Sequence, residues 1–445
     1  MRYVAYIFFL AGLGACSVQN KMSRMAKQSV LSDSAITSGH IGIAIYDPQK
    51  DKYLYNHNGE KYFTPASNTK LLTWYAALSR LGDSLVGLRY HYNVADSAYI
   101  IQPTADPSFL LPEFKEQPVL QFLQSIPCNK LGMVNDFNFR TTAYGPGWAW
   151  DDYSEAYMPE RSAFPINSNL VHFQYDADSI SVYPKIFYEP AYSSVASWNK
   201  VPAVSRNKFY IKRKPAENYF GVQSSGSGNS SSLTKIPFIT GSTALIKQIV
   251  EQQANCNIVE HSFLHGAYSF EQKIYSRPTD SLLKPMMHRS DNFFAEQTLL
   301  MLSNEMLGYM STEAIIDTLL KSDLKNFPQK PQWVDGSGLS RYNLITPRDL
   351  VWLLHKSKKE FPWQRITSSL PTGGEGTLRN YYNSDSAFIY AKTGTLNNNC
   401  ALSGYLITKK NKLLIFSVLV NNYPTGATPV RRAVEKFLKQ VRQNF

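Results

Sequence analysis

The spacing of apolar and polar residues predicts β-strands near both ends of the chain. An apolar run at 41–47 is followed by a turn-like stretch and a second run at 53–56, which is typical of a β-hairpin. Three more apolar runs, joined by short polar turns, lie at 387–392, 401–407 and 413–420. Because the turns are short, we expect these three strands to be antiparallel neighbours.

Helical spacing of apolar residues predicts several helices. Ser67 stands just before the apolar-periodic stretch 71–78, where a serine marks the start of a helix. Further helical patterns occur at 242–253, 281–302, 311–321, 347–357 and 429–442. Residues 91–240 instead hold short alternating runs and frequent turns, so we expect a β-rich segment inserted between the helical parts.

Composition and charge narrow the class of protein. The chain has 445 residues, of which 43% are hydrophobic and 18% charged, so it is globular and large enough for one large domain or two to three smaller ones. Its net charge is +12. The densest basic stretch is only 208–214, so the charge is diffuse and argues against nucleic-acid binding. A basic exported protein that works on an anionic cell wall fits this balance.

The first residues predict export. Arg2 precedes a short apolar run at 4–13, which is too short to span a membrane and is typical of a signal peptide over residues 1–15. The run ends in Leu-Gly-Ala-Cys, which resembles a bacterial lipobox and implies lipid attachment to Cys16. We therefore expect a lipidated tether at 16–37, with room for a short helix in it, and a membrane-anchored protein on the periplasmic side. The alternative is an ordinary signal peptide with an incidental cysteine.

The cysteine count limits disulfides and metal sites. If Cys16 carries lipid, Cys128, Cys256 and Cys400 remain, so we expect one disulfide or none. The sequence has no Cys-x-x-Cys pair, which argues against a cysteine zinc site. We expect neither a metal nor a cofactor.

Three short motifs occur in order along the chain. Ser67 and Lys70 form S-x-x-K, residues 290–292 form S-D-N, and residues 392–394 form K-T-G. A serine hydroxyl needs an adjacent base to act as a nucleophile, and Lys70 lies one helical turn from Ser67. Burial and a neighbouring cation such as Lys392 favour the neutral amine that a base requires. Separately, each motif is explained by a helix cap or a turn; together, in this order, they indicate one catalytic site.

The trio is that of penicillin-binding proteins and class A β-lactamases. The chain resembles the serine D-alanyl-D-alanine carboxypeptidase/endopeptidase family, the low-molecular-mass class C penicillin-binding proteins. The resemblance extends over residues 38–443. It includes six further segments, at 106–108, 145–152, 157–159, 167–169, 335–341 and 373–378.

The resemblance implies an α/β (α+β) fold: a transpeptidase-like domain, with an antiparallel sheet flanked by helices, and a β-rich inserted domain. The catalytic domain is expected at 38–90 and 241–445, and the insert at 91–240. The implied activity is cleavage of D-Ala-D-Ala in peptidoglycan stem peptides through an acyl-enzyme on Ser67, with sensitivity to β-lactams. Oligomeric state and the balance of carboxypeptidase and endopeptidase activity stay open.

The resemblance also implies roles for individual residues. The backbone amides of Ser67 and Thr395 form the oxyanion hole. Ser290 relays a proton to the leaving amine, and Asn292 holds the substrate amide. The segment Lys392, Thr393, Gly394 and Thr395 binds the substrate, because a cation and two hydroxyls suit its terminal carboxylate.

Three alternatives compete with this interpretation. A serine β-lactamase of class A needs a Glu-x-x-Leu-Asn segment to orient water, and the sequence has none. A zinc peptidase is suggested by His261 and His265 at i, i+4, but they lack the Glu of H-E-x-x-H. A non-catalytic wall-binding lipoprotein would not need all three motifs intact.

Overall fold

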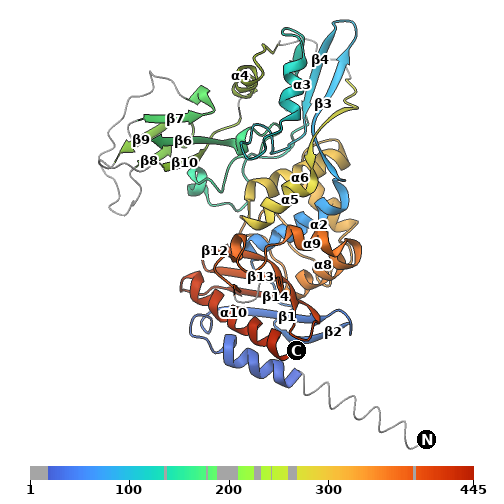
Figure 1. The fold of residues 1–445 in the computed structure, drawn as a ribbon, viewed down its shortest axis with the longest axis vertical. Helices are drawn as coiled ribbons and strands as arrows, with labels where there is room; N and C mark the ends of the chain where they lie inside the picture. Colours follow the sequence, from blue (N-terminus) through green and yellow to red (C-terminus); the bar gives the residue numbers. More distant parts are fainter. Residues whose placement is uncertain are drawn as a thin grey trace, which may run out of the picture. The chain divides into compact units, whose positions relative to one another are not determined.

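A computed structural model gives the fold of the chain and divides it into two compact units (Figure 1). The residues it describes are 19–134, 138–176, 179–187, 209–224, 232–241, 243–258, 268–383 and 387–445. Unit 1 contains the chain up to Ser79, Leu283–Ala295 and Ile316–Phe445. Unit 2 contains Arg80–Leu282 and Glu296–Ile315.

Unit 1 is built on a five-stranded antiparallel sheet whose strand order is β12-β13-β14-β1-β2. The strands are β1 (His40–Asp47), β2 (Lys52–His57), β12 (Ile389–Leu396), β13 (Asn399–Ile407) and β14 (Leu413–Asn421). The predicted hairpin and the predicted C-terminal strands are therefore confirmed. Because β1 pairs with β14, the two ends of the chain meet in the middle of the sheet.

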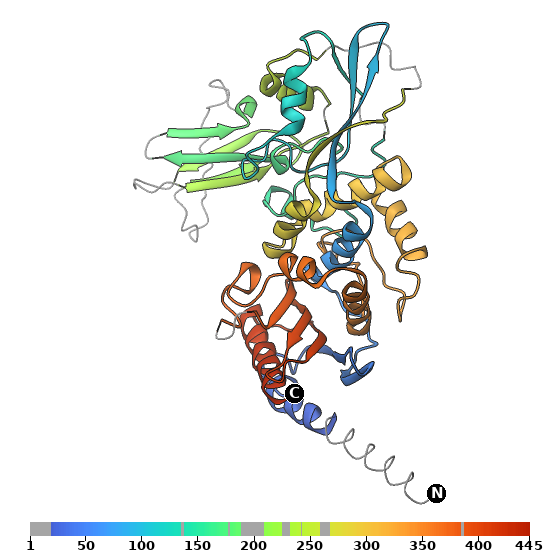
Figure 2. The same ribbon diagram turned by 45° about the vertical axis from the view of Figure 1, so that its right-hand side comes forward.

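Helices cover both faces of this sheet, as the sequence predicts (Figure 2). Side chains alternate along a strand, so neighbouring residues of β13 point to opposite faces. Leu406 joins the core cluster that contains Phe437 of α10 (Ala427–Asn444). The Tyr405 hydroxyl instead donates to the Leu354 carbonyl of α8 (Pro347–Glu360), 2.7 Å away. The sheet is thus the middle layer of three.

The edge strand β12 is only partly covered by other backbone. Ala391 N–H donates to the Pro371 carbonyl at 3.0 Å, and Thr372 bridges Tyr390. The remaining helices of unit 1, or partly in it, are α2 (Lys70–Arg80), α5 (Thr279–His288), α6 (Asn292–Leu307), α7 (Thr312–Lys321) and α9 (Trp363–Ser369).

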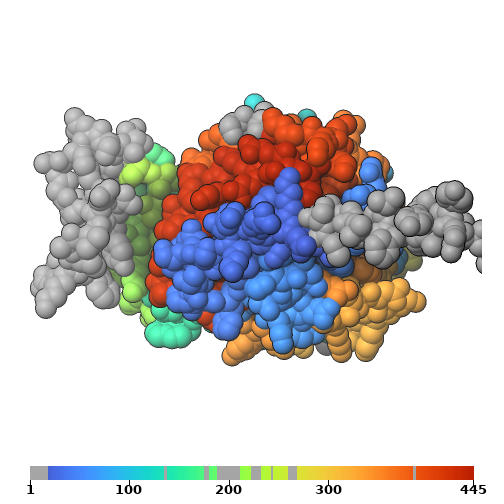
Figure 3. Space-filling view, turned by 90° about the horizontal axis from the view of Figure 1, so that it is seen from below, coloured from blue at the N-terminus to red at the C-terminus, as the bar shows by residue number. Residues whose placement is uncertain are grey.

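The N-terminal stretch contains the short helix for which the expected tether at 16–37 left room, and this helix is packed. Residues 19–31 are helical, and their apolar side chains are buried in the core beside α10. Met22, Met25, Ala26 and Val30 recur at helical spacing, so they form one apolar face that packs instead of remaining in solvent. Figure 3 shows this blue segment lying against the red C-terminal residues. Cys16 lies outside the described residues.

The helical pattern over 281–302 is interrupted. α5 ends at His288 and α6 begins at Asn292, and between them Ser290 has a φ of 61°. A non-glycine residue in this left-handed region cannot continue a helix. The interruption places a serine at a bend, which periodicity alone did not predict.

The described residues of unit 2 form three small sheets, with strand orders β11-β3-β4-β5, β10-β6-β7 and β8-β9. The first sheet contains β3 (Ser84–Asn93), β4 (Ala98–Pro103), β5 (Leu131–Met133) and β11 (Gln272–Pro278). The others contain β6 (Leu170–Asp176), β7 (Ser179–Tyr183), β8 (Phe209–Arg213), β9 (Phe220–Ser224) and β10 (Ser232–Pro237). Helices α3 (Pro118–Ser125) and α4 (Thr243–Ala254) pack with them. The expected insert, 91–240, lies within this wider unit; that it is a domain by itself stays a prediction.

In the described part of the chain, no helix is both long and apolar enough to cross a membrane. Cys128, Cys256 and Cys400 are free thiols in this structure.

Replacing Met22 by Ala tests the packing of the N-terminal helix. Met22 is fully buried, so Met22→Ala should lower the free energy of unfolding by about 2–5 kcal/mol. Urea denaturation checks this. The matched control, Gln28→Ala on the exposed face, should stay within about 0.5 kcal/mol of the wild type. Equal stability of Met22→Ala and the wild type would mean that the segment is a loose tether.

Candidate active site

Ser67 lies in the first turn of a continuous helical segment. The 3-10 turn η2 (Ala66–Thr69) leads directly into α2, and Ser67 is half-buried between the buried Ala66 and Asn68. Backbone N–H groups of a first turn have no partner four residues earlier, so they point out of the helix start. The positive end of the helix dipole therefore favours negative charge that develops at Ser67.

Lys70 is fully buried and reaches three oxygen atoms. Its Nζ lies 2.9 Å from Ser67 Oγ, 2.6 Å from Asn292 Oδ1 and 2.7 Å from the Ser337 carbonyl. The two carbonyl oxygens can only accept hydrogen bonds. When Lys70 is a neutral amine, its two N–H groups donate to these two carbonyl oxygens. The nitrogen lone pair then faces the Ser67 hydroxyl. This is the arrangement that a general base requires.

A tight loop holds the carbonyl of Ser337 against Lys70. Buried Asp335 accepts hydrogen bonds from the backbone N–H groups of Gly338 and Ser340, at 2.9 and 2.6 Å. Gly338 has a φ of +85°, and a Cβ there would lie 2.0 Å from the Ala66 carbonyl oxygen. Only glycine allows this loop to approach the nucleophile turn so closely.

The three residues of S-D-N lie at the bend before α6, and each makes a different contact. Asp291 Oδ1 accepts from Phe294 N–H at 2.9 Å and so caps the helix. Asn292, the first helical residue, faces Lys70. Ser290 turns towards Lys392, whose Nζ donates to its Oγ at 2.8 Å.

Lys392 is the second fully buried lysine of the site. Besides Ser290 Oγ, its Nζ donates to its neighbouring Thr393 carbonyl at 2.7 Å. Burial, and to a smaller extent the charge of Lys70, lowers the pKa of Lys392 well below its usual range. The charge of Lys70 thus adds to burial in disfavouring protonation of Lys392.

The glycine of K-T-G allows strand β12 to lie beside the nucleophile. A Cβ on Gly394 would lie 2.7 Å from the Pro65 carbonyl oxygen and 3.1 Å from the Ser67 nitrogen. Asn68 joins the same two segments, because its Nδ2 donates to the Lys392 carbonyl at 2.9 Å. Strand and helix start are thus held within van der Waals contact.

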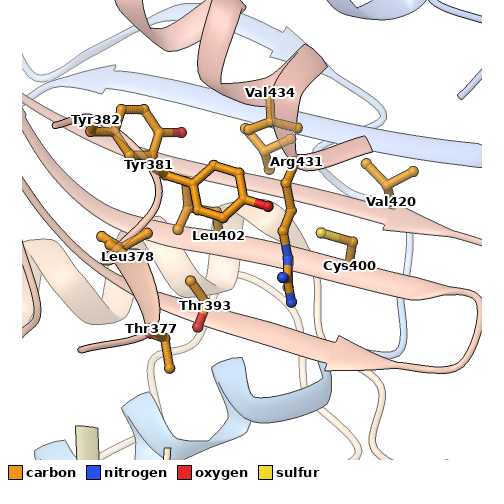
Figure 4. Close-up of a pocket in the computed structure, with 12 residues that line it drawn as sticks. Thr377, Leu378, Tyr381, Tyr382, Thr393, Cys400, Leu402, Val420, Arg431 and Val434 are labelled. Carbon is orange, nitrogen blue, oxygen red and sulfur yellow. The ribbon is translucent and has the colours of Figure 1, made fainter. Parts of the chain in front are cut away.

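A cleft with a cavity volume of about 540 Å³ opens onto these groups. Among the residues that line it are Ser67, Ser290, Thr377, Thr393, Thr395 and Arg431. A small apolar pocket adjoins it and shares several of these residues, as Figure 4 shows. In that view Arg431 extends from α10 between Tyr381 and Cys400 towards β12.

The structure brings the candidate residues of the sequence into one place. Ser67, Lys70 and Asn292 are joined by hydrogen bonds, as are Ser290 and Lys392. Thr393, Gly394 and Thr395 lie along the neighbouring edge of β12.

Three contributors were missed by sequence reasoning: Asn68, the Ser337 carbonyl and Arg431. The segment 335–341 was noted as a family resemblance, which was the available signal for Ser337. Asn68 lies inside S-x-x-K, but motif spacing gives no sign of its contact with β12. Arg431 lies in a helix whose basic residues alternate with apolar ones, so nothing in the sequence separates it from its neighbours.

No group of three or more His, Cys, Asp or Glu side chains in the described ranges could hold a metal ion. His261 and His265 lie outside those ranges. The described groups instead supply a serine, a buried amine and backbone donors, which suit acyl transfer through a covalent intermediate.

Comparison with known proteins agrees with this chemistry. The model of the "D-Ala-D-Ala carboxypeptidase 3 (S13) family" matches residues 24–443. A D-alanyl-D-alanine carboxypeptidase of Actinomadura sp. is 26% identical, over 90% of this chain and 81% of the relative. D-alanyl-D-alanine carboxypeptidase DacB of Haemophilus influenzae is 21% identical, over 89% and 88%. The crystal structure of penicillin binding protein 4 (dacB) from H. influenzae has a TM-score of 0.71 at 18% identity and covers 95% of this chain and 99% of that one. This likeness confirms the expected fold.

Gly394→Ala tests the close approach of β12. The added methyl group pushes the strand away from Ser67, so we expect acylation by a β-lactam to slow by about 100-fold. Stopped-flow labelling with fluorescent penicillin measures the rate. Gly241→Ala is the control, because a Cβ there has nothing within 4 Å and should change nothing. If Gly394→Ala is acylated as fast as the wild type, the close approach of β12 at this glycine is not needed for acylation.

The lowered pKa of Lys392 predicts a pH dependence of stability. An unfolded lysine titrates near a pH of about 10.4, so between the folded pKa and that value the unfolded chain binds more protons. The folded state therefore gains stability as the pH rises through this window. In Lys392→Met the amine is absent, so the wild-type unfolding free energy minus that of the variant should increase from pH 7 to pH 10. Urea denaturation at each pH measures it, and a difference that does not vary with pH would refute the shift.

Proposed function

The chain belongs to the D-Ala-D-Ala carboxypeptidase 3 (S13) family, and on that premise we propose that Ser67 is the nucleophile with which it cleaves D-Ala-D-Ala peptides of peptidoglycan. It is a penicillin-sensitive serine carboxypeptidase of the D-Ala-D-Ala type. The observation that carries the assignment is the contact of 2.9 Å between Ser67 Oγ and the Nζ of a fully buried Lys70.

In the first half-reaction, Ser67 Oγ attacks the carbonyl carbon of the penultimate D-Ala while its proton passes to Lys70 Nζ. The negative charge that forms on the carbonyl oxygen is received by the backbone N–H groups of Ser67 and Thr395. The peptide C–N bond then breaks. Lys70 returns the proton to the leaving nitrogen, and the Ser290 hydroxyl relays it.

Ser290 is suited to this relay because its oxygen already accepts a hydrogen bond from Lys392. Its own O–H can therefore point into the cleft, which Ser290 lines together with Ser67. In the second half-reaction a water molecule takes the place of the amine, and the same groups act in reverse order to release the acid and regenerate Ser67.

A β-lactam follows the first half-reaction but keeps its leaving nitrogen attached through the opened ring. No Glu-x-x-Leu-Asn segment is present to orient a water molecule in its place. We therefore expect the acyl-enzyme to persist, which makes the protein a target of these drugs and not a lactamase.

Carboxypeptidase and endopeptidase action use the same groups. They differ only in whether the leaving amine is free D-Ala or the side chain of a second stem peptide. The cleft that Thr393 and Thr395 line has a volume of about 540 Å³, and we propose that it receives either leaving group.

We also infer that lipid on Cys16 anchors the exported protein to a membrane. The support is the lipobox-like Leu-Gly-Ala-Cys at the end of a signal-peptide pattern. In this arrangement unit 1 follows the anchor closely, because its packed residues begin by Met22.

Ser67→Ala tests the nucleophile. With monomeric and crosslinked muropeptides as substrates, product masses should show release of D-Ala or of cleaved crosslinks by the wild type, and a loss of at least about 1000-fold in the variant. Labelled penicillin should remain covalently bound to the wild-type Ser67 peptide after tryptic digestion.

The matched control is Ser79→Ala, in the helix α2 that follows Ser67, where the serine donates through its hydroxyl to the Tyr75 carbonyl and is not among the residues that line the cleft. This variant should retain both activities. Undiminished hydrolysis by Ser67→Ala would rule out the acyl-enzyme on this residue, and rapid turnover of free penicillin by the wild type would favour a lactamase.

A further inference from the structure

The cation that the sequence assigned to the substrate carboxylate is not accessible in the structure. Lys392 is fully buried, and its Nζ already donates to Ser290 Oγ and to the Thr393 carbonyl. It is not among the residues that line the cleft. A carboxylate in the cleft must therefore be received chiefly by another group.

Three arginines line the cleft: Arg289, Arg379 and Arg431. Arg289 pairs with Asp291 at 3.2 Å and stacks over the Phe294 ring at 5.0 Å, so its charge is already balanced. Arg379 is exposed on the loop that carries the turn η7 (Gly376–Leu378). Arg431 differs from both, because its Nη2 donates to the Thr395 hydroxyl, on the strand that a substrate would follow.

Arg431 is held in place by its surroundings. Its guanidinium lies 5.9 Å from the centre of the Tyr381 ring, and Figure 4 shows it between Tyr381 and Cys400. It belongs to the second turn of α10, and Thr428 of the first turn also lines the cleft. The N-terminal end of this long helix adds positive potential at the same place.

The position matches where a terminal carboxylate would lie. In a D-Ala-D-Ala peptide the carboxylate follows the scissile carbonyl by one residue, a reach of about 3.5 Å. In the mechanism proposed above, the carbonyl oxygen lies at the Thr395 amide, and the hydroxyl of the same residue accepts a hydrogen bond from Arg431. A carboxylate one residue further on is therefore expected within reach of this guanidinium.

We propose that Arg431 and Thr395 form the carboxylate subsite of the cleft, in which the guanidinium of Arg431 binds the C-terminal carboxylate of the peptide. This inference rests on the function proposed above. A guanidinium is planar and always charged, so it can hold a carboxylate through two parallel hydrogen bonds. Thr395 keeps the guanidinium aimed at the cleft before the substrate arrives.

The test compares substrates with and without the carboxylate. Arg431→Gln should lower kcat/KM for an N-acyl tripeptide ending in D-Ala-D-Ala by about 10- to 100-fold, the range for loss of one charged hydrogen-bonding partner. The same variant should change kcat/KM for the matching D-alaninamide by less than about threefold. Arg431→Lys keeps the charge but not the paired geometry. Its kcat/KM for the D-Ala-D-Ala peptide should therefore lie between the values of the wild type and of Arg431→Gln.

Acylation by benzylpenicillin and by its methyl ester gives a second measure that does not require hydrolysis of the amide. The ratio of the acylation rates with the free acid and with the ester should be lower in Arg431→Gln than in the wild type. The decrease should match the decrease in the ratio of kcat/KM for the acid and amide peptides. Lys436→Gln, an exposed charge on the same helix, is the matched control and should retain the wild-type preference. Arg379→Gln removes a cleft charge that has no contact with Thr395, and it should reduce the preference much less.

The outcomes separate this inference from the proposed function. If Arg431→Gln slows the acid and the amide or ester forms equally, or changes neither, Arg431 does not bind the carboxylate. If Arg379→Gln has the same effect as Arg431→Gln, the general charge of the cleft is responsible and the subsite is refuted. If Ser67→Ala retains activity, the proposed nucleophile fails, whatever Arg431 does.

Discussion

The contacts of one amine hold the site together. Lys70 Nζ bonds to Ser67 in its own helix, to Asn292 at the start of another helix and to the carbonyl of Ser337 in a loop. Asn292 and Ser337 lie 222 and 267 residues from Lys70 in the sequence, yet both must reach the same atom. A buried amine without its acceptors would be strongly destabilising, so folding of unit 1 and assembly of the site are the same event.

This requirement accounts for the unusual backbone around the site. Ser290 adopts a left-handed conformation so that one short bend can direct Ser290 to Lys392 and Asn292 to Lys70. Gly338 and Gly394 lack side chains where two backbones nearly touch. Local strain and lost side-chain packing at these points are compensated by the hydrogen bonds that they make possible.

The sequence could predict the elements and the motifs because both depend on local spacing. The C-terminal strands, the hairpin and the helix after Ser67 follow from periodicity. The sequence left room for a short N-terminal helix but did not predict its packing, because its polar residues outnumber the few apolar ones that are buried. The contacts of Asn68, Ser337 and Arg431 join segments distant in sequence, and two of them involve backbone carbonyls, which no residue type can reveal. The complete burial of Lys392 also follows from the packing of distant segments, and the K-T-G motif gives no sign of it.

The incomplete cover on strand β12 has a consequence for the behaviour of the protein in solution. An uncovered sheet edge invites pairing with another chain, and long exposed edges promote aggregation. Here the Pro371–Thr372 backbone closes off Tyr390 and Ala391, and only the short stretch from Thr393 onward faces the cleft. The same cover that shortens the free edge limits the length of chain that can pair with it, so an added strand has only a few residues of β12 to bind.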